Sequence, residues 1–562
     1  MVPRRSLKNR ARRVYISTLQ TIKPAYIELY YDRIAPHLKT SSNNNLITLW
    51  FLALLIGVSV GAATLLFRYA IGAVQWLWIG STEEAIGSLL ADTPRYMFFL
   101  APIIGGIIVG QILHHFIEAK RPHTVADVIE AKAIKGCHID TRDGLWSAIV
   151  AAVGLGFGAS AGREGPVVHL GATLASLLSR ASTFTHEHRR IFLASGVAAA
   201  VSASFNAPIA GVLFAHEVIL AHYGLTAFVP IVLSSVAGSI IVRLTIGEFP
   251  AFLIPEYSIT SYWEFPAFFL LGLVAAMVSI IFQLSLSTAE RVASSFEMPI
   301  WLRPIIGGAL VGLIALVFPE ILGVGYDTTD DALKQNLSLI LLFSLLVAKT
   351  AATAITLASR FGGGIFSPTL YLGACTGGAY GLIAAAAFPE IASSNGLYAI
   401  LGMGAVAAAT LGAPISTTMI VFELTGGYTL SIALLLTVSI STALTQSVLG
   451  MSFFHWQLST RGIFLFQGPH KEIARTLTVS DFYTPLENPE PLELGEDGKT
   501  PPTIRITDNI EHCLRAFDQH GLPSLPVIID KTDSEIIGHA KHVDALDAYN
   551  QSLIRAHEEE HH

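Results

Sequence analysis

Long apolar stretches constrain this chain more than any other sequence feature. The longest cover residues 46–69, 97–116, 265–286, 304–318, 337–357 and 430–444. Several of them reach the roughly 20 residues that a helix needs to cross a bilayer. Charged residues make up only 14% of the chain, against about 25% in soluble domains, because charge is costly inside a membrane. The sequence therefore predicts an all-α polytopic membrane protein and argues against a free cytosolic enzyme or a disordered chain.

Shorter apolar pieces, cut by glycine and proline, lie between these stretches. They cover residues 145–158, 166–178, 191–201, 208–220, 366–388, 397–410 and 414–424, and they are expected to be too short to cross a bilayer unaided. Non-helical backbone is tolerated at membrane depth only where it is buried in protein or lines a cavity. The sequence therefore predicts broken and re-entrant helices around a permeation or binding site, with re-entrant packing without a ligand as the alternative.

An internal repeat joins the two halves of the membrane region. The segment that starts at Gly162 matches the segment that starts at Gly364, an offset of 202 residues. An Ala-Pro-Ile motif at Pro208 recurs 206 residues later at Pro414, and in both copies a glutamate follows the proline by nine residues. Two motifs at nearly one offset indicate a duplicated unit of about 200 residues, and repeats with broken helices at their interface are a common transporter design.

Each copy of the first motif has the pattern of a helix start. In the first copy, glycines precede Pro166 and a helix is expected over Val167–Leu178. A helix N-terminus presents unpaired N–H groups and a partial positive charge, so it attracts anions. The second copy carries no charged side chain, and the amides of Ile365 and Phe366 are expected to face an anion. A cation pathway would need carboxylate rings or clustered carbonyls, and the sequence has no convincing cluster of either kind.

Glu164 stands in the segment that should attract an anion, between glycines and beside Arg163. One interpretation is a carboxylate that occupies the anion's own place and must swing out, or be protonated, before an anion passes. The other interpretation is a buried Arg–Glu pair that holds the loop.

These motifs resemble those of the CLC family of chloride channels and proton-coupled chloride exchangers. Gly162-Arg-Glu-Gly-Pro166, the GxFxP pattern at Gly364–Pro368 and Asn206–Gly211 carry the resemblance, which covers about residues 46–466. It implies two inverted repeats, about 46–245 and 262–466, in a homodimer with one anion pathway per subunit. It makes Glu164 the gating glutamate. It also implies an anion-binding region at Gly162, Arg163, Gly165, Gly364, Ile365 and Phe366.

The sequence departs from the family pattern where exchangers commonly carry an internal proton-transfer glutamate. That position, one residue after Glu217, is Val218 here, as in family channels. His216 and Glu217 are adjacent titratable groups that can substitute, although a histidine satisfied by helix packing is the simpler interpretation. The departure favours a channel-like or poorly proton-coupled pathway, and an H⁺/Cl⁻ exchanger (antiporter) is the alternative.

Two further departures concern the inner gate. His123 aligns with a serine that contacts chloride in the family, and Thr124 is the nearest hydroxyl. Phe464 stands where the family has a tyrosine near the end of the last membrane helix. An inner gate that lacks both hydroxyls is expected to be wider and less selective among monovalent anions.

The two ends of the chain are polar. Residues 1–45 are basic and are expected to be a cytoplasmic flank, since basic residues favour that side of a membrane. Residues 467–562 are expected to form a cytoplasmic α/β tail that resembles one CBS motif, about 479–555, with strands at 503–507, 525–530 and 536–538 and helices at 510–520 and 543–553. Residues 484–502 are expected to be an acidic, turn-rich insertion. The resemblance allows adenine nucleotide binding, and no other cofactor or metal is expected.

The resemblance therefore implies a chloride transport protein of a cell inner membrane, and both termini are expected to be cytoplasmic. Its expected partners are chloride and similar monovalent anions, membrane lipids and a second copy of the chain. The net charge of −7 gives no reason to expect nucleic acid. A sodium-coupled solute symporter is a remote alternative. An intramembrane enzyme using Glu164, His169 and His216 is not favoured, because no nucleophile or metal-ligand spacing accompanies these groups.

Overall fold

The protein is described by a computed structural model, which defines residues 46–82, 93–180, 184–247, 252, 257–425, 430–465, 477–491, 501–529 and 535–561. The basic segment predicted at 1–45 lies outside these residues. Within them, seven helical stretches are long and apolar enough to cross a membrane. They are α3 (Leu46–Ile79), α5 (Arg95–His115), α11 (Leu225–Ile246), η4 with α12 (Tyr262–Ser295), α15 (Leu339–Ala358), α16 (Phe366–Ala387) and α19 with α20 (Ser431–Ser459).

Shorter helices fill the space between these stretches, as the broken apolar pieces predict. They are α6 (Val125–Ile134), α7 (Thr141–Gly156), α8 (Glu164–Ser179), α9 (His186–Phe205), α10 (Pro208–Phe214), η3 (Ala215–Leu220), α13 (Leu302–Ala315), η5 (Pro319–Ile321), α14 (Tyr326–Leu333), α17 (Asn395–Leu411) and α18 (Pro414–Thr425). One expectation is wrong: residues 366–388 were expected to be too short to cross, but α16 is a continuous 22-residue apolar helix.

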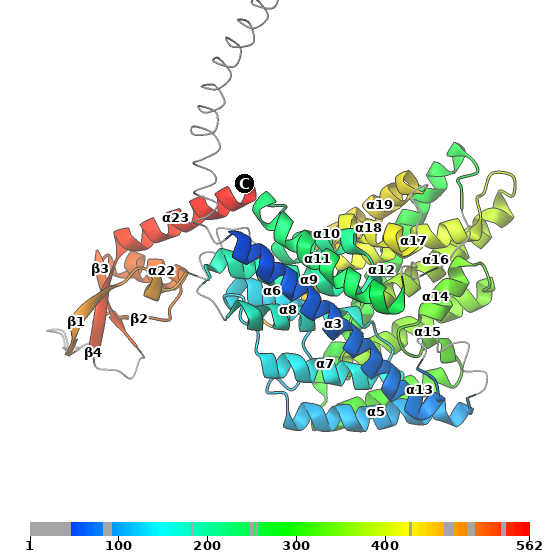
Figure 1. Ribbon diagram of the computed structural model, residues 1–562, viewed down its shortest axis with the longest axis horizontal. Coiled ribbons are helices and arrows are strands. Elements are labelled where there is room, and N and C mark those ends of the chain that lie inside the picture. The colour runs from blue at the N-terminus through cyan, green and yellow to red at the C-terminus, as the bar shows by residue number, and fades with distance from the viewer. Residues whose placement is uncertain are drawn as a thin grey trace, which may run out of the picture. The chain divides into compact units, whose positions relative to one another are not determined.

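Helices from the two halves of the chain pack against each other in matched pairs. The helix α5 lies along α13, and α10 lies against α18 (Figure 1). A Pro-Ile-Ile-Gly-Gly motif starts at Pro102 in α5 and again at Pro304 in α13, so the repeat extends to a third motif at the same offset of 202. A Cβ on Gly106 would lie 2.4 Å from the Pro304 oxygen, and a Cβ on Gly308 would lie 2.2 Å from the Pro102 oxygen. Such reciprocal contacts are those of a local two-fold axis.

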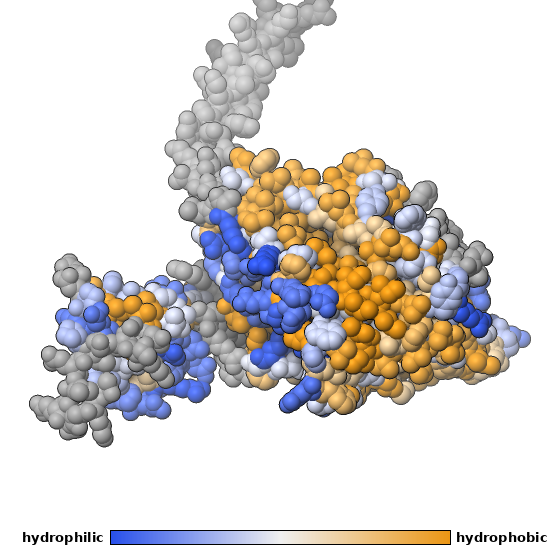
Figure 2. Space-filling model, turned by 90° about the horizontal axis from the view of Figure 1, so that it is seen from below, coloured by the Kyte–Doolittle hydropathy of each residue, from blue (hydrophilic) through white to orange (hydrophobic). Residues whose placement is uncertain are grey.

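Glycines also allow α8 to pack closely on α9, and α16 on α17. A Cβ on Gly171 would lie 2.5 Å from the oxygen of Gly196, and a Cβ on Gly373 would lie 2.4 Å from the oxygen of Gly402. Close backbone approach between membrane helices is what glycine provides, because lipid offers no hydrophobic drive for association. Figure 2 shows apolar side chains over much of the face of the bundle in view, beside a patch of hydrophilic ones.

The tail is a small α/β unit with a four-stranded sheet. Its strands are β1 (Thr484–Pro491), β2 (Ile504–Arg505), β3 (Ser524–Ile528) and β4 (Glu535–Lys541), in the order β1-β4-β3-β2. Its helices are η6 (Val479–Asp481), α22 (Ile510–His520) and α23 (His542–His561). The tail core is a cluster of buried side chains from these three helices and the sheet, which includes Phe517, Leu525 and Ala545.

Sequence reasoning found α22, α23 and three of the tail's strands, but not η6. The start of the acidic, proline-rich insertion was expected to be turn-rich, but residues 484–491 form β1. This strand pairs only with β4 and lies at the edge of the sheet. An edge strand tolerates proline because the outer side of its backbone needs no donor for a ladder.

Candidate functional site

The first turns of α8 and α16 meet inside the bundle. The Gly162 N–H donates to the Gly364 oxygen at 2.7 Å, and the Gly364 N–H donates to the Gly162 oxygen at 2.6 Å, as an isolated antiparallel bridge. Sequence reasoning expected a helix from Val167, but α8 already begins at Glu164. Pro166 therefore lies inside the first turn, where a helix tolerates proline because the missing N–H has no intrahelical acceptor.

Glycine is required at this meeting point. Gly363 has a φ of +148°, and a Cβ placed on it would lie 2.4 Å from the Ala161 Cβ. A Cβ on Gly165 would lie 2.9 Å from the Gly364 Cα, so a larger residue would push the two helix starts apart. The repeated glycines are thus explained by the close approach of two backbones and, at Gly363, by a positive φ that other residues rarely adopt.

Glu164 is 1% exposed and its carboxylate lies at the N-terminus of α16. Its Oε1 atom accepts a hydrogen bond from the Tyr326 hydroxyl at 2.8 Å and one from the Ser367 hydroxyl at 2.6 Å. Arg163 is farther away, with 3.8 Å between its Nε and the Glu164 Oε1. The carboxylate is held mainly by hydroxyl groups from the second repeat, and the Arg–Glu pair is the weaker contact.

Two of the predicted anion-binding amides are already occupied. The N–H groups of Gly162 and Gly364 donate to each other's oxygen, so they brace the two helix starts and are not available to an anion. Ile365 and Phe366 lie where the first amides of a helix have no intrahelical acceptor. Arg163 donates to the Ser204 oxygen at 3.1 Å, and its guanidinium carbon lies 5.1 Å from the centre of the Tyr326 ring.

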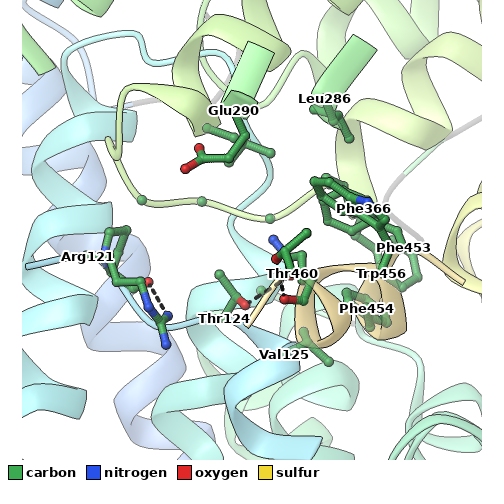
Figure 3. Close-up of a pocket in the computed structure, with 18 of the residues that line it drawn as sticks. Arg121, Thr124, Val125, Leu286, Glu290, Phe366, Phe453, Phe454, Trp456 and Thr460 are labelled. Carbon is green, nitrogen blue, oxygen red and sulfur yellow. Dashed lines mark hydrogen bonds between the residues drawn. The ribbon is translucent and has the colours of Figure 1, made fainter. Parts of the chain in front are cut away.

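A cavity of about 420 Å³ reaches these helix starts. Its wall includes Glu164 together with Gly165, Gly364, Ile365 and Phe366, but neither Gly162 nor Arg163. Four arginines and one further acid also line it: Arg121, Arg291, Arg360, Arg461 and Glu290. Figure 3 shows Arg121 on one side of the cavity and the aromatic rings of Phe366, Phe453 and Trp456 on the other. A cleft lined with an excess of positive charge concentrates anions.

Of the inner-gate candidates, only Thr124 belongs to the wall of this cavity. The His123 ring stacks on the buried His169 ring with 5.0 Å between centroids, and its Nδ1 lies 3.4 Å from Asp127 Oδ1. Phe464 is 49% exposed and is not part of the wall either. The inner-gate roles of His123 and Phe464 stay predictions, and near the end of the last membrane helix Trp456 and Thr460 line the cavity.

Asp127 ties α6 to the segment that follows α20. Its carboxylate accepts from the Thr124 N–H at 2.7 Å in a capping box at the start of α6. This bond fixes the position of Thr124, which lines the cavity. The Asp127 carboxylate also accepts from Arg121 at 2.6 Å and from Arg461 at 2.8 Å. The part of the cavity wall that contains Arg121, Thr124 and Arg461 is therefore held by one carboxylate between two arginines.

The two repeated glutamates cap each other's helices. The carboxylate of Glu217 accepts from the amides of Ile415 and Ser416 at the start of α18, at 3.0 and 2.7 Å. Glu423 accepts from the amides of Ile209 and Ala210 at the start of α10, at 3.1 and 2.7 Å. Each glutamate thus caps the helix that carries the equivalent motif in the other repeat. The nine-residue spacing therefore encodes a cross-cap between repeats, and both oxygens of Glu217 are engaged in it.

His216 is also engaged in local packing. Its Nδ1 lies 3.0 Å from the His222 oxygen, and its ring stacks on Tyr223 with 5.7 Å between centroids. None of His216, Glu217 and Val218 belongs to the wall of the 420 Å³ cavity. Glu217 and His216 were suggested as substitutes for the proton-transfer acid. In the structure, Glu217 caps a helix and His216 packs against its neighbours.

Sequence reasoning missed Tyr326 and Ser367. They lie 162 and 203 residues from Glu164 in the chain, and Tyr326 belongs to no repeated motif. Ser367 belongs to the recognised GxFxP pattern, and its hydroxyl beside the expected helix start could have indicated a hydrogen-bond donor to a buried anion.

A second cavity, of about 400 Å³, lies in the tail. It is lined by Thr478, Arg505, Thr507, Asp508, Asn509 and His512. Nucleotide binding there stays a prediction. Within the described part of the chain, no group of three His, Cys, Asp or Glu side chains is placed to hold a metal ion.

Comparison with known proteins agrees with this architecture. Residues 105–446 match the family model for voltage gated chloride channels. The chain is 32% identical to a putative chloride channel protein ClcB-like from Ralstonia nicotianae, covering 68% of this chain and 90% of the relative. It is 29% identical to the H⁺/Cl⁻ exchange transporter ClcA of Vibrio cholerae, covering 73% and 89%. The crystal structure of a slow cyanobacterial Cl⁻/H⁺ antiporter superposes with a TM-score of 0.66 at 22% identity, covering 74% and 97%. The predicted fold class is thereby confirmed.

Proposed function

Because the chain belongs to the CLC family of voltage-gated chloride channels and related anion transporters, we propose that Glu164 gates its chloride pathway. The observation that carries the proposal is the position of the Glu164 carboxylate, which is buried at the start of α16 and held by two hydroxyl groups. A helix N-terminus favours a negative charge. The carboxylate therefore occupies a place that suits a chloride ion, and an anion enters when the side chain leaves.

The cavity supplies the approach to this place. Its arginines attract anions, and the amides of Ile365 and Phe366 receive them at the end of the path. No fixed positive side chain is needed at the narrowest point, since conduction requires a site that an ion can also leave.

We propose that coupling to protons is weak or absent. The position after Glu217 is Val218, and the neighbouring acid and histidine are engaged in a helix cap and in ring stacking. Proton-coupled exchange is the second candidate. It is favoured by the relatives described as H⁺/Cl⁻ exchangers and by the retained gating glutamate, which can carry a proton by itself.

Flux measurements on the full chain in protein-only liposomes test both points. A chloride electrode should record chloride efflux down a gradient, and a pH electrode should record little accompanying proton movement. Uphill proton transport in fixed ratio to chloride would establish exchange and overturn weak coupling. An absence of chloride flux would overturn the transport proposal itself.

The gate is tested by Glu164→Gln and Glu164→Ala. Both should change the chloride flux and its pH dependence, because the group that competes with the anion is neutralised or removed. The matched control is Glu264→Gln, since Glu264 is 2% exposed and likewise accepts from a tyrosine and a serine hydroxyl, those of Tyr398 and Ser393. Equal behaviour of the Glu164 variants and wild type would reject the gate.

We also propose the assembly and orientation that the family resemblance implies: a homodimer in the inner membrane with both termini cytoplasmic. Leu225, Leu244 and Ile432 are exposed apolar side chains on α11 and α19, and either lipid or a second copy would cover them. The mass of the protein in detergent, measured by light scattering, tests the dimer. Protease access from each side of sealed vesicles tests the orientation.

A further inference from the structure

Tyr326 and Ser367 direct their hydroxyls at one point, the Oε1 atom of Glu164. The two donor–acceptor distances are 2.8 and 2.6 Å, and the two hydroxyl oxygens are 3.5 Å apart. The wall of the 420 Å³ cavity includes Glu164 but neither Tyr326 nor Ser367, so the carboxylate reaches the cavity while the two hydroxyls that hold it are not part of the wall.

The segment that leads into Tyr326 is held by a buried lysine side chain. Lys349 is 0% exposed, and its Nζ donates to the oxygens of Ile321 and Gly323 at 3.0 Å each. These carbonyls belong to the segment that leads directly into Tyr326. Gly325 has a φ of +86°, and a Cβ there would lie 2.8 Å from the Tyr371 ring, so the turn before Tyr326 is tightly enclosed.

The surroundings of the Tyr326 ring suit an anion. The Arg163 guanidinium lies over its face, with 5.1 Å from the guanidinium carbon to the centroid, and the Phe252 ring meets it edge-on at 5.7 Å. A hydroxyl that donates to a carboxylate oxygen can donate equally to a halide, because both are anionic acceptors. A movement of Glu164 away from this point removes the acceptor of both hydroxyls.

We propose that the Tyr326 and Ser367 hydroxyls are ligands of the transported anion, which they bind in the place that the Glu164 carboxylate vacates. This inference rests on the proposed function of Glu164 as the gate. In this arrangement, the two hydroxyls first hold the Glu164 carboxylate in place and then bind the anion that replaces it. The carboxylate and the anion therefore use the same two hydrogen-bond donors in turn. Lys349 acts as a positioning residue for Tyr326.

The test is made in the Glu164→Ala background, where the place is already vacant. Chloride affinity is measured by titration calorimetry on the purified full chain in detergent. Adding Tyr326→Phe should weaken chloride binding about tenfold, the usual order for one hydrogen bond to a charged group. Ser367→Ala should weaken it similarly. The matched control is Tyr398→Phe, which removes a hydroxyl that donates to the buried Glu264 at 2.9 Å and should leave the affinity within twofold.

The outcomes separate this inference from the function on which it rests. Unchanged chloride affinity with Tyr326→Phe, in protein that elutes as a single species, overturns the role of Tyr326. If that variant does not fold, unchanged affinity with Ser367→Ala overturns the hydroxyl pair. An absence of chloride flux in wild-type liposomes would instead overturn the proposed function. Normal wild-type flux with a tenfold loss in both variants supports the two hydroxyls as anion ligands.

Discussion

Lys349 is a single residue on which a whole turn depends. It is fully buried in α15, and its amino group donates to the backbone oxygens of Ile321 and Gly323 and lies 5.1 Å from the centre of the Tyr371 ring. Removing such a donor leaves buried acceptors without a partner, which costs more than the bond itself contributes.

We predict that Lys349→Met lowers the free energy of unfolding by about 2 kcal/mol or more, since two carbonyls lose their donor. Thermal unfolding of the purified protein in detergent measures the change. Lys334→Met is the control, because Lys334 forms only an exposed ion pair with Asp330 and its loss should cost less than about 1 kcal/mol. Equal melting of the two variants would contradict the structural role of Lys349.

The tail offers a second prediction at the scale of one residue. Burial, with the nearby Asp508 carboxylate, raises the pKa of the Cys513 thiol to about 12. The thiolate is the reactive form of cysteine, so at pH 7.4 the thiol should resist maleimide in the native protein and react after denaturation. Peptide mass spectrometry measures the labelled fraction. An introduced cysteine at the exposed Gln551 should label promptly under the same conditions, and rapid native labelling of Cys513 would contradict the packing of the tail core.

Among the elements, α10 and α18 are joined by the exchange of carboxylate caps. Each helix begins at a proline that follows an alanine, and the first amides of each are capped by the glutamate that stands nine residues after the proline of the other helix. A side-chain cap satisfies amides that the helix itself leaves without acceptors.

We predict that Glu217→Gln and Glu423→Gln destabilise the protein by similar amounts, about 1–2 kcal/mol each, because an amide keeps only one of the two accepting oxygens. Thermal unfolding again measures the effect. The exposed Glu187, in the first turn of α9, serves as the control, and its change to glutamine should stay within about 0.5 kcal/mol. A large effect at one glutamate and none at the other would contradict the reciprocal cap.

The junction of α8 and α16 gives a prediction for two elements at once. Gly165→Ala places a Cβ 2.9 Å from the Gly364 Cα, so the helix starts must separate. Overpacking of this kind costs about 1–3 kcal/mol, and it displaces Glu164, so the chloride flux in liposomes should fall sharply. Gly378→Ala in α16 is the matched control, because its Cβ would meet nothing closer than 3.5 Å. Normal flux with Gly165→Ala would show that the junction tolerates separation.

At the scale of the whole molecule, the two halves of the bundle do not form separate cores. Their matched helices pack on each other, and the glycine contacts of α5 with α13 cross from one half to the other. Neither half can bury these surfaces alone.

We therefore predict that a chain divided between α11 and η4 recovers chloride flux when both halves are produced together, whereas either half alone fails to accumulate. Co-purification on a tag carried by one half, followed by flux measurement, tests this. A second division in the middle of α12 should not recover, because it interrupts a membrane-crossing helix. A stable, monodisperse single half would refute the shared core.

The sequence predicted much of this architecture because the controlling signals were local. The repeat, the helix starts at the two glycine-rich motifs and the tail's helix at Ile510–His520 all follow from short patterns. The Pro-Ile-Ile-Gly-Gly repeat at Pro102 and Pro304 was equally visible but was overlooked. The roles of Tyr326, Lys349 and His123 were not predictable, because each depends on which distant side chains the fold brings beside them.

The reciprocal bond between Gly162 and Gly364 has a consequence for how such a chain can evolve. Identical copies of an ancestral unit would place the same side chain at both equivalent positions, which here hold Glu164 and Phe366. Two carboxylates beside one local axis would repel each other and would leave the anion no uncharged helix start. Divergence at this one pair therefore lets a symmetric scaffold support an asymmetric task, in which one copy supplies the gate and the other supplies the amides. Substitutions that preserve the local two-fold packing must therefore occur at both equivalent positions. A substitution that creates the gate must occur at only one of them.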